Sequence, residues 1–224
     1  MKSRLIKKAL PSAVKQLEDI YASKKEEIIS RLREFERIWT EGNDEEIFAE
    51  LAFCLFTPQS KAKSCWEAIL SIKDQDLLLK GTPDEIKRRL HCVRFHNKKA
   101  RYLVEARRLF LKSGSISVQP LLKGFAGIYE TRDWLVKNIK GIGYKEASHF
   151  LRNIGLGEKI AILDRHILRN LDLLDVIAMI PGSLGRARYL QIEKRMSDFS
   201  EHINIPLSHL DLLLWYKETG EIFK

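Results

Sequence analysis

Two residues in the second half of the chain have side chains that could do covalent chemistry on a substrate. Lys145 offers an amine nucleophile, and Asp164 offers a carboxylate that can stabilise positive charge or move a proton. The turn Gly141-Ile142-Gly143 comes just before Lys145, and glycine tolerates the positive φ of a tight turn. A helix N-terminus after this turn disfavours a cation, and the neutral amine is the nucleophilic form of lysine. The pattern favours a nucleophilic lysine, with a solvated, phosphate-contacting lysine as the alternative.

The same turn predicts a place where a phosphate can bind. The helix that follows it points unpaired N–H groups and a partial positive charge toward the turn. Contacts of this kind fix a protein on a nucleic-acid backbone without reading its sequence. A glycine turn between helices is also common as a plain connection, so the motif alone leaves both interpretations open. The residues predicted to contact DNA are Lys140, Gly141, Gly143, Tyr144, Arg165 and His166.

The composition is that of a basic globular protein. The chain has 224 residues, a net charge of +9 and 45% hydrophobic residues. A surplus of Lys and Arg favours polyanionic partners, most often nucleic acid. The three cysteines, Cys54, Cys65 and Cys92, are too few for a four-cysteine iron–sulfur cluster. His91 and His96, beside Cys92, lack the usual spacing of zinc ligands, so we expect no metal and no cofactor.

No segment of the sequence predicts export or a membrane anchor. The basic start, Met1–Lys8, lacks the apolar run of a signal peptide. No apolar stretch approaches the length that spans a bilayer. We therefore expect a monomeric cytoplasmic protein, associated with the nucleoid and not with membranes.

Apolar residues recur every three or four positions, and strand-like alternation is almost absent, which predicts an all-α protein. Thr82, before Pro83, is a strong helix start, and Asp133 is expected to cap the first helix of the glycine hairpin. Gln59 or Ser60 is expected to start another helix. Asp164 is an ideal cap for the helix after it, which is the plain structural alternative to a chemical role. Helices are expected at 12–39, 44–55, 60–70, from 83, 98–111, 134–139, 144–153, 165–173, 186–202 and 207–217.

These motifs resemble the helix-hairpin-helix superfamily of DNA glycosylases. Residues 135–147 are similar to the superfamily's hairpin, in which Lys145 stands at the position of the catalytic lysine. Residues 161–166 are similar to the segment that carries the catalytic aspartate, here Asp164. The resemblance implies two lobes with the active cleft between them and no iron–sulfur cluster. The expected lobes are 48–158, and 1–47 together with 159–224.

Two further segments carry the resemblance. Residues 53–60 are similar to an early helix whose glutamine, here Gln59, lies near the extruded base. Residues 94–100 are similar to a characteristic Lys-Ala helix start. Within the superfamily, the chain resembles the type-2 8-oxoguanine DNA glycosylase/AP lyases, which end soon after a tryptophan-bearing helix. That likeness implies a base pocket containing Gln59, Trp215 and the terminal Lys224.

The resemblance implies a repair enzyme that acts on double-stranded DNA containing an oxidised base. Lys145 would displace 8-oxoguanine from the sugar, Asp164 would stabilise the positive charge, and a lysine Schiff base would lead to β-elimination. Two other interpretations stay open. One is a related glycosylase/lyase for oxidised pyrimidines, and the other is a helix-hairpin-helix module that binds DNA without catalysis.

Overall fold

A computed structural model describes residues 11–224, and the basic segment Met1–Lys8 lies outside the described residues. The described chain divides into two compact units, one of residues 35–156 and one of residues 11–34 with 157–224. The first boundary falls inside the long helix α1, and the second follows α9. The helices are α1 (Pro11–Thr40), α2 (Asp44–Phe56), α3 (Ala62–Asp74), α4 (Leu77–Lys80), α5 (Pro83–Arg89), α6 (His96–Phe110), α7 (Gln119–Leu122), α8 (Ile128–Asn138), α9 (Tyr144–Asn153), α10 (Arg165–Leu173), α11 (Arg186–His202) and α12 (Leu207–Thr219). The predicted all-α fold is confirmed.

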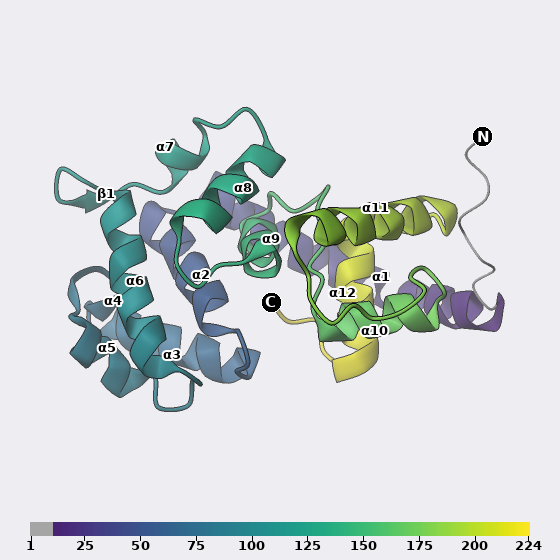
Figure 1. Ribbon diagram of the computed structural model, residues 1–224, viewed down its shortest axis with the longest axis horizontal. Coiled ribbons are helices and arrows are strands. Elements are labelled where there is room, and N and C mark those ends of the chain that lie inside the picture. Colours follow the sequence, from purple (N-terminus) through teal and green to yellow (C-terminus); the bar gives the residue numbers. More distant parts are fainter. Residues whose placement is uncertain (1–10) are drawn as a thin grey trace. The chain divides into compact units, whose positions relative to one another are not determined.

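Helix α2 is the core of the unit formed by residues 35–156. Asn43 caps it, because its side chain accepts from the Glu46 N–H while the Glu46 carboxylate accepts from the Asn43 N–H. Every residue from Ile47 to Phe56 is buried, as expected of a helix that is apolar on all faces. The helix packs against α3, α6 and α9, which lie around it in Figure 1. It therefore fixes the places from which those three helices present their side chains.

The second unit packs α12 against α10 and α11 (Figure 1). Two side chains of α11 hold the extended segment that leads into α10. The Glu193 carboxylate accepts from the Ala161 N–H at 2.8 Å. The Tyr189 hydroxyl donates to the Ala161 carbonyl at 2.7 Å and accepts from the Leu163 N–H at 3.2 Å. Residues 160–163 are all buried, so the chain enters α10 along a fixed path.

The predicted hairpin is present between α8 and α9, and Gly155, two residues after the end of α9 at Asn153, has φ +79°. The prediction that Asp133 caps α8 is wrong. Helix α8 begins at Ile128 after Gly127, which places Asp133 inside it. The Asp133 carboxylate instead accepts a hydrogen bond from the Tyr144 hydroxyl at 2.6 Å. This bond joins the two helices of the hairpin across their turn.

Two other predicted boundaries are wrong. Helix α3 starts after Lys61, because Gln59 and Ser60 belong to the turn that precedes it. Helix α6 ends at Phe110, and the next residues form a short antiparallel hairpin of β1 (Leu111–Lys112) and β2 (Ser115–Ile116). In that hairpin Leu111 pairs with Ile116. The predicted starts at Thr82 and Asp164 are confirmed by side-chain caps.

Candidate active site

The glycine turn brings the chain sharply from α8 into α9, whose second residue is Lys145. Gly141 has φ +86°, and a Cβ there would lie 2.7 Å from the Tyr102 ring and 3.0 Å from a Leu55 methyl carbon. Only glycine fits at this position, both in backbone conformation and in space. Gly143 differs, since its φ of −101° suits any residue. The positive φ expected in the turn is therefore found at Gly141 and not at Gly143.

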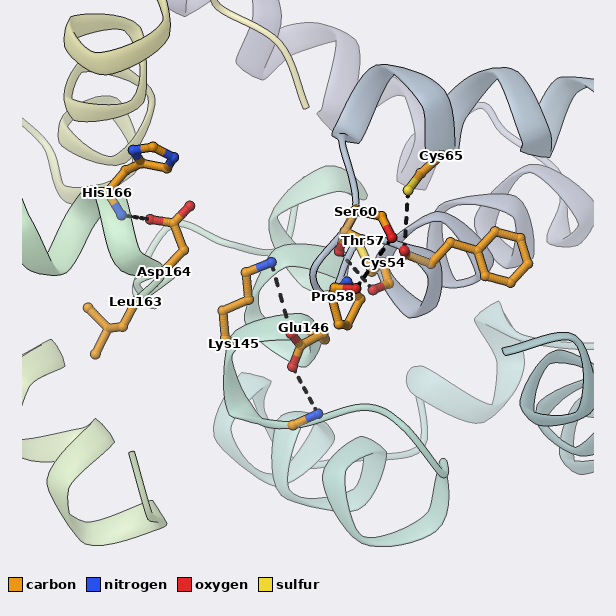
Figure 2. Close-up of polar contacts among 12 residues, drawn as sticks. Cys54, Thr57, Pro58, Ser60, Cys65, Lys145, Glu146, Leu163, Asp164 and His166 are labelled. Carbon is orange, nitrogen blue, oxygen red and sulfur yellow. Dashed lines mark hydrogen bonds and ion pairs between the residues drawn. The ribbon is translucent and has the colours of Figure 1, made fainter. Parts of the chain in front are cut away.

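Glu146 links the turn to the Lys145 amine, as Figure 2 shows. Its Oε2 accepts from the Gly143 N–H at 3.1 Å, and its Oε1 lies 4.0 Å from the Lys145 Nζ. Both side chains are largely covered, with 24% of Lys145 and 16% of Glu146 exposed. One carboxylate thus caps α9 and also stands beside the predicted nucleophile.

Buried thiols lie on the side of this pair toward α2 and α3. Burial raises the pKa of Cys54 well above its usual value, the Glu50 charge adds to the rise, and the charge of Lys145 opposes it. Burial also raises the pKa of Cys65 to about 11. The Cys65 thiol donates to the Phe56 carbonyl at 3.2 Å (Figure 2). Both thiols interact electrostatically with Lys145, and their raised pKa values keep them neutral near neutral pH.

The other predicted hairpin residues contact protein groups in the structure. Lys140 is exposed and forms an ion pair of 2.8 Å with Glu105 of α6. Tyr144 donates to Asp133, and the Arg132 guanidinium lies 5.5 Å from the centre of the Tyr144 ring. The Lys140 ammonium is thus at the surface beside the turn, whereas the Tyr144 ring belongs to the packing of the hairpin.

Gln59 lies in the turn between α2 and α3, in the same unit as Lys145. Its side chain is exposed, and its φ of +56° is in the left-handed region. Sequence reasoning missed the contacts of two side chains, Glu146 beside the hairpin and Lys99 beside Gln59. Glu146 carried a signal, because an acid at the third position of a helix is typical of a capping box. Lys99 entered the sequence analysis only as part of the Lys-Ala helix start at residues 94–100, and its burial, with 4% exposed, carried no signal because lysine is seldom buried.

Asp164 is the N-cap of α10, in the other unit. Its Oδ1 accepts from the backbone N–H groups of His166 and Ile167, both at 2.8 Å, and Figure 2 shows the bond to His166. Both bonds use one oxygen, and Oδ2 makes no hydrogen bond within residues 11–224. The predicted cap is confirmed. The same geometry holds the carboxylate rigid while it leaves one oxygen available to a ligand.

The structure brings several other predicted residues together around the start of α10. The His166 ring meets the Trp215 ring edge to face, with centroids 5.2 Å apart. His166 also lies 3.7 Å from the Glu218 carboxylate and accepts from the Arg165 guanidinium at 3.3 Å. Trp215 and Lys224 are half-buried. After α12 the chain turns at Gly220, with φ +74°, and Ile222 is buried, so the final residues pack against the protein.

Neither metal sites nor membrane spans are found in the part of the chain that the structure describes. Within residues 11–224, no group of three or more His, Cys, Asp or Glu side chains could hold a metal ion. Over the same residues, no helix is both long enough and apolar enough to cross a bilayer.

Solved structures share this fold. The 8-oxoguanine DNA glycosylase of Thermotoga maritima superposes with a TM-score of 0.84 at 35% identity, over 95% of this chain and 99% of that one. The Methanocaldococcus jannaschii 8-oxoguanine glycosylase/lyase, solved with a 15mer DNA containing 8-oxoguanine, superposes with a TM-score of 0.85 at 38% identity. That match covers 94% of this chain and 99% of the other. The fold is that of the helix-hairpin-helix glycosylases.

The sequence comparisons narrow the class to a family. Residues 28–205 match the family described as 8-oxoguanine DNA glycosylase. An 8-oxoguanine DNA glycosylase/AP lyase of Fusobacterium nucleatum is 49% identical over 93% of this chain and 96% of its own length. One of Methanocaldococcus jannaschii is 40% identical over 94% and 99%. The chain belongs to the 8-oxoguanine DNA glycosylase family.

Proposed function

We propose that this chain excises 8-oxoguanine from double-stranded DNA and then cleaves the strand at the abasic site, with Lys145 as the nucleophile. The observation that carries the proposal is the placement of Lys145, which is partly covered, follows the glycine turn and has one carboxylate beside it. Relatives named 8-oxoguanine DNA glycosylase/AP lyase support the same activity.

The chemistry follows from the two predicted groups. The neutral Lys145 amine attacks the anomeric carbon, and the glycosidic bond breaks with its electron pair leaving on the base, which gains a proton. Positive charge grows on the sugar during this step, and a fixed carboxylate at Asp164 stabilises it. The sugar ring then opens to a lysine Schiff base. Loss of a C2′ proton expels the 3′ phosphate, and water releases the enzyme.

The proposed base pocket consists of Gln59, Trp215 and Lys224. An aromatic surface suits stacking against an extruded base, and Trp215 supplies one beside His166. 8-Oxoguanine differs from guanine by an oxygen on C8 and a hydrogen on N7, and an acceptor that faces N7 separates the two bases by about 1–3 kcal/mol. We assign this selectivity to the terminus at Lys224, through its carboxylate or its side chain. We assign a contact with the extruded base to Gln59. Deleting Lys224 should reduce the excision of 8-oxoguanine relative to that of guanine, and unchanged selectivity would refute the assignment.

Borohydride trapping on a duplex containing 8-oxoguanine tests the nucleophile. The native chain should give a covalent adduct, and Lys145→Gln should abolish it while retaining duplex binding. Lys194→Gln is the matched control, because Lys194 is exposed on α11 and pairs with Asp198. Binding without any adduct would instead support a non-catalytic module. An adduct formed only with oxidised pyrimidines would support the alternative substrate.

We also propose an oligomeric state and a location for the protein. We propose a monomer that acts on chromosomal DNA in the cytoplasm, with the lobes at 48–158 and at 1–47 plus 159–224 both engaging the duplex. No step above needs a metal or an organic cofactor. Sedimentation of the chain with and without duplex measures the stoichiometry, and a two-to-one complex would contradict the monomer.

A further inference from the structure

The segment between α2 and α3 forms a tight turn in an unusual conformation. Thr57-Pro58-Gln59-Ser60 closes with a hydrogen bond of 2.9 Å from the Ser60 N–H to the Thr57 carbonyl. Proline at the second position and a positive φ at the third are typical of a type II turn. That third residue is normally glycine, but here it is Gln59 with φ +56°. The turn therefore holds a strained residue whose side chain is exposed.

A buried lysine from α6 binds this turn from inside the unit. The Lys99 ammonium donates to the Phe56 carbonyl at 2.6 Å, the Pro58 carbonyl at 2.7 Å and the Ser60 hydroxyl at 3.2 Å. All three partners are uncharged oxygens, and they lie on both sides of Gln59. Only 4% of Lys99 is exposed. An ammonium carries three donors, so this site uses all of them.

A second contact on the same hydroxyl fixes the other end of the turn. The Ser60 Oγ accepts from the Arg94 N–H at 3.0 Å as well as from Lys99. Strained backbone persists only where its surroundings determine it, and it gathers at sites that bind ligands. Here the surroundings consist of Lys99, Ser60 and the Arg94 backbone. Burying a lysine charge is costly, and the three hydrogen bonds to the end of α2 and the turn offset that cost only while the turn keeps this conformation.

We propose that Lys99 is a positioning residue for base recognition: its ammonium holds the Thr57–Ser60 turn in the conformation that presents Gln59 to the extruded base. The inference rests on the proposed function, because it takes Gln59 as part of the base pocket. It concerns only the step that needs the base. Cleavage at an abasic site, which has no base to recognise, proceeds through Lys145 and does not depend on the turn.

Single-turnover rates on two duplexes test this separation. Lys99→Met should lower the excision of 8-oxoguanine about tenfold or more, as loss of positioning does, while cleavage of a preformed abasic site stays within about threefold. Gln59→Ala should give the same pattern. The double variant should be no slower than the slower single variant, because the two side chains act as one unit. Equal losses on both duplexes, or no loss on either, would overturn the proposal.

Two further variants keep the test decisive. Lys80→Met is the matched control, since Lys80 is exposed on α4 and pairs with Asp76. Lys99→Arg keeps charge and donors but not their geometry, so its loss of excision should be intermediate. If Lys99→Met does not fold, Lys99→Arg takes its place in the comparison of the two duplexes.

Hydrogen exchange of the free protein tests the role of Lys99 in holding the turn independently of enzyme activity. The Ser60 amide, which closes the turn, should exchange with solvent faster in Lys99→Met, or in Lys99→Arg, than in Lys80→Met. If the native chain cleaves neither duplex, the proposed function fails, and this exchange still shows whether Lys99 holds the turn. Unchanged exchange would refute the role of Lys99.

Discussion

At the scale of single residues, the site is built from charged side chains with more than one partner. Glu146 caps α9 through the Gly143 N–H and also faces the Lys145 amine. Asp164 caps α10 with one oxygen and keeps the other available. Lys99 donates to three oxygens, one at the end of α2 and two in the Thr57–Ser60 turn. In each case the bonds that hold a helix or turn also fix the orientation of a group near the proposed chemistry.

Replacing the Glu146 carboxylate should distinguish the effect of its contact with the Lys145 amine from that of its hydrogen bond with the Gly143 N–H. Glu146→Gln keeps an oxygen for the Gly143 N–H but cannot take up the proton that Lys145 must lose to become a nucleophile. We expect base excision to slow about a hundredfold or more, with duplex binding unchanged. Glu146→Ala should show the same loss and also destabilise the fold by about 1 kcal/mol, because the cap is gone. Native rates in Glu146→Gln, measured in single turnovers, would contradict this role.

The buried Lys99 should also make stability depend on pH. Burial lowers its pKa to about 8, whereas the unfolded side chain keeps the ordinary lysine value. Between about pH 8 and the ordinary lysine pKa of 10.5, the unfolded state therefore binds more protons at this residue, and the free energy of unfolding rises with pH. The charged or titratable groups that face Lys99 are Cys65, Glu146, Lys145 and Arg94.

The comparison that isolates this effect is between the native chain and Lys99→Met. From about pH 8 to 9 the native chain should gain stability relative to the variant, and titration of the cysteines in the unfolded state contributes equally to both proteins. Urea unfolding at several pH values measures the difference. A difference that stays flat or shrinks over that range would contradict a depressed pKa at Lys99.

At the scale of elements, the glycine hairpin shows how a turn is built against a neighbouring helix. The Tyr102 ring of α6 lies where a side chain at position 141 would stand. Gly141→Ala should therefore incur both backbone strain and a steric clash, destabilising the fold by about 1–3 kcal/mol and weakening duplex binding. Gly114→Ala is the matched control, because Gly114 has a similar φ of +83° but nothing within 4 Å. Thermal unfolding of both variants separates the cost of backbone strain from that of the clash. An equal loss of stability in the two variants would exclude the clash.

The sequence allowed most helices of the fold to be predicted, because caps and helical periodicity are local signals. Thr82 and Asp164 cap the helices that they were predicted to cap. The prediction failed at Asp133, because an acid before an apolar run has the sequence pattern of a helix cap. In the structure its carboxylate instead accepts from the Tyr144 hydroxyl, a tertiary partner. The β1–β2 hairpin was missed because each strand has only two residues, which is too short for alternation to show.

The site was less predictable than the fold. Lys145, Asp164 and the hairpin follow from residue types and short spacings, and their predicted roles remain predictions. The contact of Lys99 with the turn at Gln59 joins residues about forty positions apart, and no periodicity reveals such a pairing. The ion pair of Lys140 with Glu105 is of the same kind. Contacts of this sort depend on how helices pack.

At the scale of the whole molecule, the net charge of +9 predicts binding to DNA that depends strongly on salt. Lys140 should contribute one phosphate contact, so Lys140→Gln should reduce the slope of log affinity against log salt by about one. Glu105→Gln removes the partner of Lys140 and a negative charge, and should tighten binding about twofold to fivefold. Titration of undamaged duplex at several salt concentrations measures both. An unchanged slope in Lys140→Gln would exclude its contact with DNA.

The buried thiols have a consequence for an enzyme whose proposed substrate is made by oxidants. Peroxide reacts with a thiolate far faster than with a thiol, and the reaction also needs solvent access. Cys54 and Cys65 are fully buried, and their pKa values are raised, so both stay protonated near neutral pH. The exposed Cys92 lies away from the hairpin in sequence, in the loop before α6. The residues around Lys145 can therefore survive the oxidative stress that creates the lesions, and repair can continue while that stress lasts.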